Sequence, residues 1–227
     1  MSDLIDSLIS EGWLKTPRII EAFRKIKRAD FLPENMKNFS ELNEALPIGF
    51  GQTISQPLVV AFMLELLEPK EGEKILDVGS GSGWTSGLLA QIVSQKEISN
   101  SQLPISEKNS NFKSQIPKGK VIAIEIVPEL VEFGKKNVAK YNFIKSGIVE
   151  FFWADGSKGF EKEAPFDKIL ASASAKKLPL AWKEQLKIGG RIVTPIGNSI
   201  WLFIKKSEKE FEEKEYPGFV FVPLISN

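Results

Sequence analysis

The sequence predicts an α/β fold in which a mostly parallel sheet carries helices on both faces. Three observations lead to this prediction. From residue 71 onward, short apolar strands alternate with helical segments, which is typical of βαβ units. The first of these strands runs into a glycine-rich turn, Gly79 to Gly83, that opens a helix. The stretches on either side have other patterns, so we expect an N-terminal helical addition and antiparallel strands at the C-terminus.

The N-terminal part, residues 1–70, is predicted to form helices around an irregular segment. Thr16 followed by Pro17 is typical of an N-cap and a first helical residue. Residues 29–56 contain prolines and glycines without a clean period, which indicates an ordered but irregular segment. Helices are predicted around residues 4–9, from Pro17 to about Ile26, and from about Pro57 to Glu68.

The central part, residues 71–197, is predicted to hold the parallel sheet and the main binding site. Its strands are predicted at Lys74–Val78, Lys120–Glu125, Ile148–Trp153, Asp167–Ala171 and Arg191–Pro195. The helices between them are predicted at about Thr85–Val93, Pro128–Tyr141 and Leu178–Leu186. In the last part, residues 198–227, two antiparallel strands are predicted to finish the sheet, at Ile200–Lys206 and Phe219–Leu224.

Residues 94–118 interrupt this alternation. They are rich in Ser, Asn, Gln and Lys and carry few periodic apolar residues. Structureless loops of this length are uncommon inside a compact domain, so we interpret the segment as an insertion. It joins the end of a helix to the start of a strand, which places it at the amino edge of the sheet, away from the ligand crevice at the carboxyl ends.

The composition excludes several classes of function. The 227 residues include no cysteine and no histidine, so disulfides, thiol nucleophiles, Ser-His triads and Cys/His zinc sites are excluded, and we expect no metal. A net charge of +1 gives no basic footprint for nucleic acid. No apolar stretch approaches the ~18 residues that span a bilayer, and the N-terminus lacks a signal pattern. We therefore expect a cytoplasmic protein without a membrane partner.

The glycine-rich turn is the strongest functional signal. An apolar strand ends in the carboxylate of Asp77, and a G-x-G-x-G turn leads from it into a helix. Glycines allow a sharp turn and let a ligand approach the backbone closely, so we expect a nucleotide-type ligand, with an unliganded tight turn as the alternative. The turn residues are Gly79, Ser80, Gly81, Ser82 and Gly83.

Trp84 bears on which ligand the turn would take. A dinucleotide motif places a small residue in this slot for close helix–strand packing, and tryptophan is too large for that. No P-loop motif is present. S-adenosylmethionine has no phosphate and carries a cationic sulfonium, which the carboxylate of Asp77 would attract.

Two further acidic residues follow neighbouring strands. Glu125 ends the second strand, where a carboxylate can accept hydrogen bonds from ribose hydroxyls. It lies 48 residues after Asp77. Without the 25 residues of the insertion the separation is 23 residues, close to the usual ~20. Asp155 and Gly156 follow the third strand, where Asp155 could reach an adenine amino group. The alternatives are a solvated strand end for Glu125 and an Asp-Gly turn without a ligand for Asp155.

On these residues the chain resembles the protein-L-isoaspartate O-methyltransferase family from about Arg18 to Leu224, apart from the insertion. The glycine motif is shared by many methyltransferases, whereas the segment Gly51–Pro57 is far more specific. After the fourth strand, the serines and lysines within Ala171–Pro179 depart from the family's pattern. The matching stretches are Ala45–Pro57, Leu76–Trp84, Asp155-Gly156, Ala164–Asp167, Leu186–Arg191 and Phe221–Leu224.

The resemblance implies a Rossmann-like fold that binds S-adenosylmethionine and releases S-adenosyl-L-homocysteine. It implies methylation of the free carboxylate of L-isoaspartyl residues in damaged proteins, which starts their repair. Ser55 matches the family's active-site serine, and its position before a helix also suits an N-cap. Thr53 and its neighbours Ile54 and Gln56 match the substrate cleft. In the family, the residues at the positions of Glu125 and Asp155 hold the cofactor. We expect the other cofactor-binding residues to be Asp77, Gly79, Ser80, Gly81, Gly83 and Gly156.

Three other functions compete with this one. The first is a methyltransferase for RNA or a small molecule; the near-neutral charge argues against RNA. The second is a non-catalytic cofactor-binding scaffold that assembles through the insertion or the apolar tail 219–225, and the same two segments are candidate surfaces for a homo-oligomer. The third is a nicotinamide dehydrogenase, which Trp84 disfavours.

Overall fold

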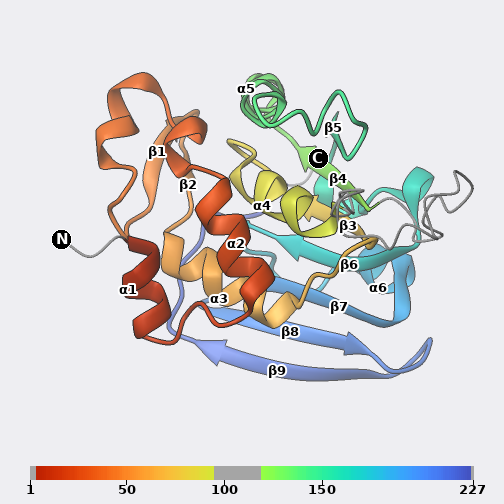
Figure 1. Cartoon of the computed structure of the whole chain (residues 1–227). Coiled ribbons are helices and arrows are strands. Elements are labelled where there is room, and N and C mark those ends of the chain that lie inside the picture. Colours follow the sequence, from red (N-terminus) through yellow and green to blue (C-terminus); the bar gives the residue numbers. More distant parts are fainter. Residues whose placement is uncertain (1–3, 95–118, 226–227) are drawn as a thin grey trace, which may run out of the picture.

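A seven-stranded sheet lies at the centre of the computed structural model, which describes residues 4–94 and 119–225 (Figure 1). The strand order is β5-β4-β3-β6-β7-β8-β9. The first five strands in this order pair in parallel, and β8 and β9 continue the sheet antiparallel, which confirms the predicted fold class. The strands are β3 Lys74–Val78, β4 Lys120–Glu125, β5 Val149–Trp153, β6 Phe166–Ala171, β7 Leu186–Ile196, β8 Ser199–Lys205 and β9 Phe211–Pro217.

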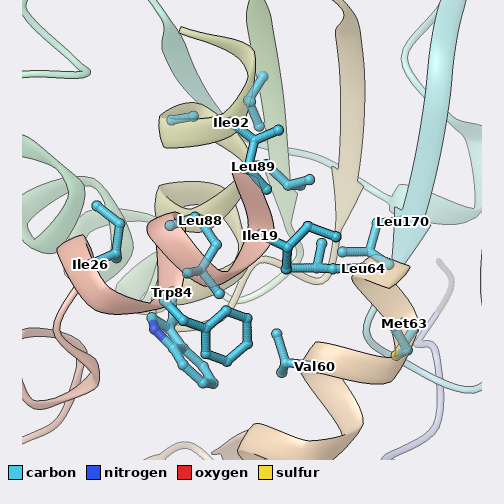
Figure 2. Packing of buried hydrophobic residues seen from close by; sticks show 14 of the residues in the cluster. Ile19, Ile26, Val60, Met63, Leu64, Trp84, Leu88, Leu89, Ile92 and Leu170 are labelled. Carbon is cyan, nitrogen blue, oxygen red and sulfur yellow. The ribbon is translucent and has the colours of Figure 1, made fainter. Parts of the chain in front are cut away.

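Helices cover both faces of this sheet because successive strand residues point to opposite sides. In β3, Ile75 packs into the cluster of the helices α2 to α5, while Leu76 and Val78 pack with Trp182 of α6 on the other face. Figure 2 shows the larger cluster, where side chains of α2, α3 and α4 meet Leu170 of β6. The helices are α1 Leu4–Ser10, α2 Pro17–Lys25, α3 Pro57–Leu67, α4 Trp84–Val93, α5 Pro128–Ala139 and α6 Leu180–Gln185.

The segment 29–56 is more regular than the sequence predicted. It contains the 3₁₀ helices η1 Arg28–Phe31 and η2 Glu34–Phe39, followed by an antiparallel ribbon of β1 Leu46–Gly49 and β2 Gln52–Ile54. Strands of three and four residues are too short to show a period. The turn between them has positive φ at Gly49, Phe50 and Gly51, a conformation that glycine adopts readily and that a side chain such as phenylalanine rarely does.

The prediction of a strand at Phe219–Leu224 was wrong. The last strand of the sheet is β9, Phe211–Pro217, which pairs along β8. Its sequence FEEKEYP is mostly exposed and charged, as is common for edge strands that must resist pairing with other chains; it therefore lacks the apolar alternation that identifies a strand. Residues 219–225 instead run to the carboxyl edge of the sheet, where Val222 and Leu224 exchange backbone hydrogen bonds with Ser174.

The predicted insertion 94–118 lies, apart from Ser94, outside the described residues. Its two ends are described: Ser94 follows α4, and Gly119 precedes β4. Among the residues that the structure describes, no helix combines the length and apolarity needed to cross a membrane.

Candidate functional site

A pocket lies at the carboxyl ends of the central strands, and its empty space, open solvent at the mouth included, is about 750 Å³. This is the edge at which parallel α/β sheets bind ligands. Four segments that are distant in sequence form most of its wall. They are Gln52–Ser55, Gly79–Ser82, Glu125 with its neighbours Ile124 and Ile126, and Val222–Ile225.

The glycine turn forms the floor of this pocket. The backbone N–H groups of Gly79 and Ser80 both donate to the carbonyl of Ile124, at 2.9 and 3.1 Å, so the turn crosses over the end of β4. Gly79 and Gly81 have φ of 73° and 52°, which favours glycine. Gly83 serves another purpose: a Cβ there would lie 2.9 Å from the Gly134 carbonyl oxygen, so it allows α4 and α5 to pack closely.

Glu125 holds the turn in place. Its Oε2 accepts a hydrogen bond from the Gly81 N–H at 2.9 Å, and its Oε1 accepts from the N–H groups of Ile126 and Val127 at 2.8 and 3.0 Å. The residue is only 6% exposed and lines the pocket, so it is not a solvated strand end. A carboxylate with these three bonds still has an acceptor position for a ligand hydroxyl.

Asp77 lies beneath the turn, outside the pocket lining. It is fully buried, and its Oδ2 accepts hydrogen bonds from Ser86 Oγ at 2.6 Å and Thr85 Oγ1 at 3.0 Å. Its Oδ1 is buried without a hydrogen-bond partner among the described residues. Burial in this apolar setting raises the pKa of Asp77 to about 6, with a further contribution from the negative charge of Glu125.

Asp155 and Gly156 have separate positions. Asp155 accepts hydrogen bonds from the N–H and hydroxyl of Ser157, at 3.0 and 2.7 Å, and pairs with Lys158 at 3.3 Å. It therefore supports the turn after β5. Gly156 lines the pocket, and a Cβ at this residue would overlap Cγ1 of Val78. A glycine here lets the backbone lie against the end of β3.

Ser55 lines the same pocket as the glycine turn and comes directly after strand β2. It is half-buried and lines the pocket, and its hydroxyl has no hydrogen-bond partner in the part of the chain that the structure describes. Helix α3 begins at Pro57, and its N-cap position is Gln56, which makes no side-chain cap. The N-cap reading of Ser55 is therefore not supported, and its hydroxyl is available to a ligand.

The structure brings most of the predicted site residues to one pocket. Those that line it are Thr53, Ile54, Ser55, Gly79, Ser80, Gly81, Glu125 and Gly156. Those placed behind or beside it are Gln56, Asp77, Gly83 and Asp155.

Sequence reasoning missed several residues of the pocket. Trp84, Ser172 and Ala173 line it, as do Val222–Ile225. Ser172 and Ala173 follow β6 and belong to the stretch Ala171–Pro179. Val222–Ile225 follow β9, and all but Ile225 belong to the stretch Phe221–Leu224; the patterns of both stretches stood out in the sequence. Ser80 Oγ and Trp84 Nε1 are buried without a partner among the described residues, so the pocket offers hydrogen-bonding groups to a ligand and fits a polar cofactor.

Comparison with known proteins agrees with this geometry. The family model described as protein-L-isoaspartate(D-aspartate) O-methyltransferase matches residues 1–227. A protein-L-isoaspartate O-methyltransferase of Methanopyrus kandleri is 37% identical over 226 residues, which cover 98% of this chain and 89% of the relative. Protein-L-isoaspartate O-methyltransferase 2 of Archaeoglobus fulgidus is 40% identical over 210 residues, covering 91% and 84%.

A solved structure shares the fold. It is a Plasmodium falciparum protein described as a candidate protein-L-isoaspartate O-methyltransferase, in complex with S-adenosyl-L-homocysteine. The match has a TM-score of 0.78 and covers 99% of this chain and 97% of that one, at 24% sequence identity. At this identity the likeness supports the fold, including the N-terminal and C-terminal additions.

Proposed function

Since the chain belongs to the protein-L-isoaspartate(D-aspartate) O-methyltransferase family, we propose that its pocket holds S-adenosylmethionine against the glycine turn and the acceptor carboxylate against Ser55. The enzyme methylates the free carboxylate of L-isoaspartyl residues in damaged proteins and so initiates their repair. The observation that carries the site assignment is the position of Ser55, which lines the same pocket as Glu125 and the glycine turn.

The residues of the cofactor side fit the donor. Gly79 and Gly81 keep the floor free of side chains, while Glu125 can accept from the ribose hydroxyls. The carboxylate of Asp77, fixed beneath the floor by two hydroxyls, adds negative charge close to a cationic ligand. When bound, S-adenosylmethionine supplies an electrophilic methyl group on a positively charged sulfur.

The acceptor requires no general base. An isoaspartyl carboxyl has a reference pKa near ~4 and is ionised at pH 7. One of its oxygens forms the new bond to the methyl carbon as the carbon–sulfur bond breaks, and the electron pair remains on the sulfur. The protein must therefore supply alignment and exclusion of water, effects worth up to ~7–11 kcal/mol in well-aligned systems. A chain without histidine can catalyse this step.

Ser55 would orient the acceptor by donating a hydrogen bond, not by acting as a nucleophile. We expect Ser55→Ala to lower kcat on an isoaspartyl peptide by about 10- to 100-fold, the value of one lost hydrogen bond to a charged group, and to leave the Kd for S-adenosyl-L-homocysteine nearly unchanged. Ser207→Ala is the matched control, because Ser207 is exposed in the β8–β9 turn. Equal losses of turnover and cofactor affinity would contradict this role.

The acceptor itself is tested with paired substrates. Purified enzyme is given an isoaspartyl peptide, its aspartyl twin and an RNA, and methyl incorporation from labelled S-adenosylmethionine is counted. We expect incorporation into the isoaspartyl peptide alone. Equal labelling of both peptides, or labelling of the RNA, would overturn the substrate assignment. Action in the cytoplasm and self-association stay predictions, which cell fractionation and sedimentation would check.

A further inference from the structure

Arg28 lies behind the pocket wall, in a position that the reaction as described does not use. It is the first residue of η1 and only 6% exposed. Burial lowers the pKa of its guanidinium to about 10, an effect that Glu41 partly offsets, so the group is still charged at pH 7. A buried charge of this kind is costly unless hydrogen bonds compensate for it.

Four backbone carbonyls compensate for the charge of Arg28. Its Nη1 donates to the carbonyls of Ser40 and Leu42, at 3.1 and 2.9 Å, and its Nη2 donates to those of Glu44 and Ser55, at 2.6 and 3.2 Å. The two ends of the segment 40–55 are thereby tied to one planar group. That segment includes the ribbon β1–β2 and carries the acceptor side of the pocket.

The guanidinium of Arg28 also lies over the ring of Trp84. The guanidinium carbon lies 5.4 Å from the centre of the Trp84 ring, within the range of a cation–π interaction. Trp84 is the first residue of α4 and lines the pocket beside the glycine turn. Arg28 therefore contacts the cofactor wall through Trp84 and the acceptor wall through the Ser55 carbonyl.

We propose that Arg28 is a positioning residue that sets the place of Ser55 relative to the cofactor side of the pocket. The inference rests on the proposed role of Ser55. Methyl transfer needs its reacting atoms in near-attack geometry, where a misplacement of about 1 Å can cost about 100-fold in rate. A lysine cannot replace this function, because a single ammonium lacks the planar fork that reaches several carbonyls at once.

The experiment is a double-mutant cycle of Arg28→Lys and Ser55→Ala. For each enzyme, kcat and KM on an isoaspartyl peptide are measured well below the melting temperature, together with the Kd for S-adenosyl-L-homocysteine. We expect R28K to lower kcat at least ~10-fold in the wild-type background, as misplacement predicts, and less than ~3-fold in the S55A background, because the two residues act through one contact. The Kd should change less than ~3-fold.

Arg24→Lys is the matched control, since Arg24 lies four residues earlier, is exposed and pairs only with Asp6 among the described residues; its kcat should equal that of the wild type. Equal fold losses of kcat by R28K in both backgrounds would overturn the proposal, as would unchanged kcat. If R28K does not fold, Arg28→Gln is assayed with saturating S-adenosylmethionine against the same criteria. A wild-type enzyme that fails to distinguish isoaspartyl from aspartyl peptide would instead refute the proposed function.

Discussion

Replacing Asp77 by asparagine tests whether the buried charge beneath the glycine turn serves binding at the expense of stability. The carboxylate oxygen Oδ2 accepts from Ser86 and Thr85, and an amide oxygen can do the same. The amide nitrogen would take the place of Oδ1, which has no donor among the described residues. The substitution therefore removes the charge and leaves the hydrogen bonds intact.

The pKa of Asp77 sets the size of the effect. It is about 6 in the folded chain against 3.8 for the free group, which corresponds to a destabilisation on the order of 2–3 kcal/mol above pH 6. Between about pH 4 and 6 the folded chain keeps a proton that the unfolded chain has lost, so the contribution of Asp77 to stability falls as pH rises through this window. Asp77→Asn should be more stable than the wild type at pH 7, and the difference should shrink towards zero near pH 4.

Two measurements check this prediction. Urea unfolding at pH 7 and pH 4 gives the stability difference, with Asp6→Asn as an exposed control. Calorimetry gives the affinities for S-adenosylmethionine and S-adenosyl-L-homocysteine, which differ by the methyl group on sulfur and the positive charge that comes with it. We expect D77N to weaken binding of the first more than that of the second. A D77N protein that is less stable than the wild type at pH 7, or that loses equal affinity for both ligands, would refute the reasoning.

Three further predictions concern the pocket and the insertion. Glu125→Gln should raise the Kd for S-adenosyl-L-homocysteine about 10- to 100-fold by calorimetry. The NH₂ group of the glutamine side chain must face one of the backbone N–H donors and leave that donor unpaired. An unchanged Kd would contradict this. Gly156→Ala should lower Tm by about 3–10 °C in a thermal melt, since its Cβ overlaps Val78. Exchange of residues 95–118 for a four-residue Gly/Ser linker should keep kcat on isoaspartyl peptide within about 2-fold, because Val93 and Gly119 contact each other and neither lines the pocket. Loss of activity in a folded protein would count against this prediction.

The central sheet was predictable because its strands are buried on both faces. Such strands form nearly continuous apolar runs, and the predicted bounds Lys74–Val78 and Lys120–Glu125 are those of β3 and β4. The edge was not predictable in the same way. β9 pairs with one neighbouring strand and otherwise faces mostly solvent, so charged residues are tolerated along it. The apolar residues Val222–Ile225 instead line the pocket without forming a strand.

The cofactor side of the site was predictable to a similar degree, since it depends on local sequence. Glycines at fixed spacing after a strand, and a carboxylate at the end of the next strand, are visible without knowing the fold. The position of Asp77 beneath the turn could not be predicted in this way, because its distance from the ligand depends on the path of the turn above it. Arg28 left no signal either: its partners are backbone carbonyls of residues 40, 42, 44 and 55, and any residue type supplies a carbonyl.

The junctions of the insertion show why a long segment can be added to this fold without disturbing the site. Gly119 packs so closely against Val93 that a Cβ would overlap its carbonyl oxygen, and the same oxygen accepts from the N–H of Gly72. The end of helix α4 and the start of β4 therefore lie side by side, whereas the pocket residue Glu125 lies at the other end of β4. For chain length alone, a connection of 24 residues costs only about 1.6 kcal/mol more to close than one of four. Since that cost falls on folding and not on the geometry of the pocket, shortening the connection should raise stability by up to this amount and leave methyl transfer unchanged.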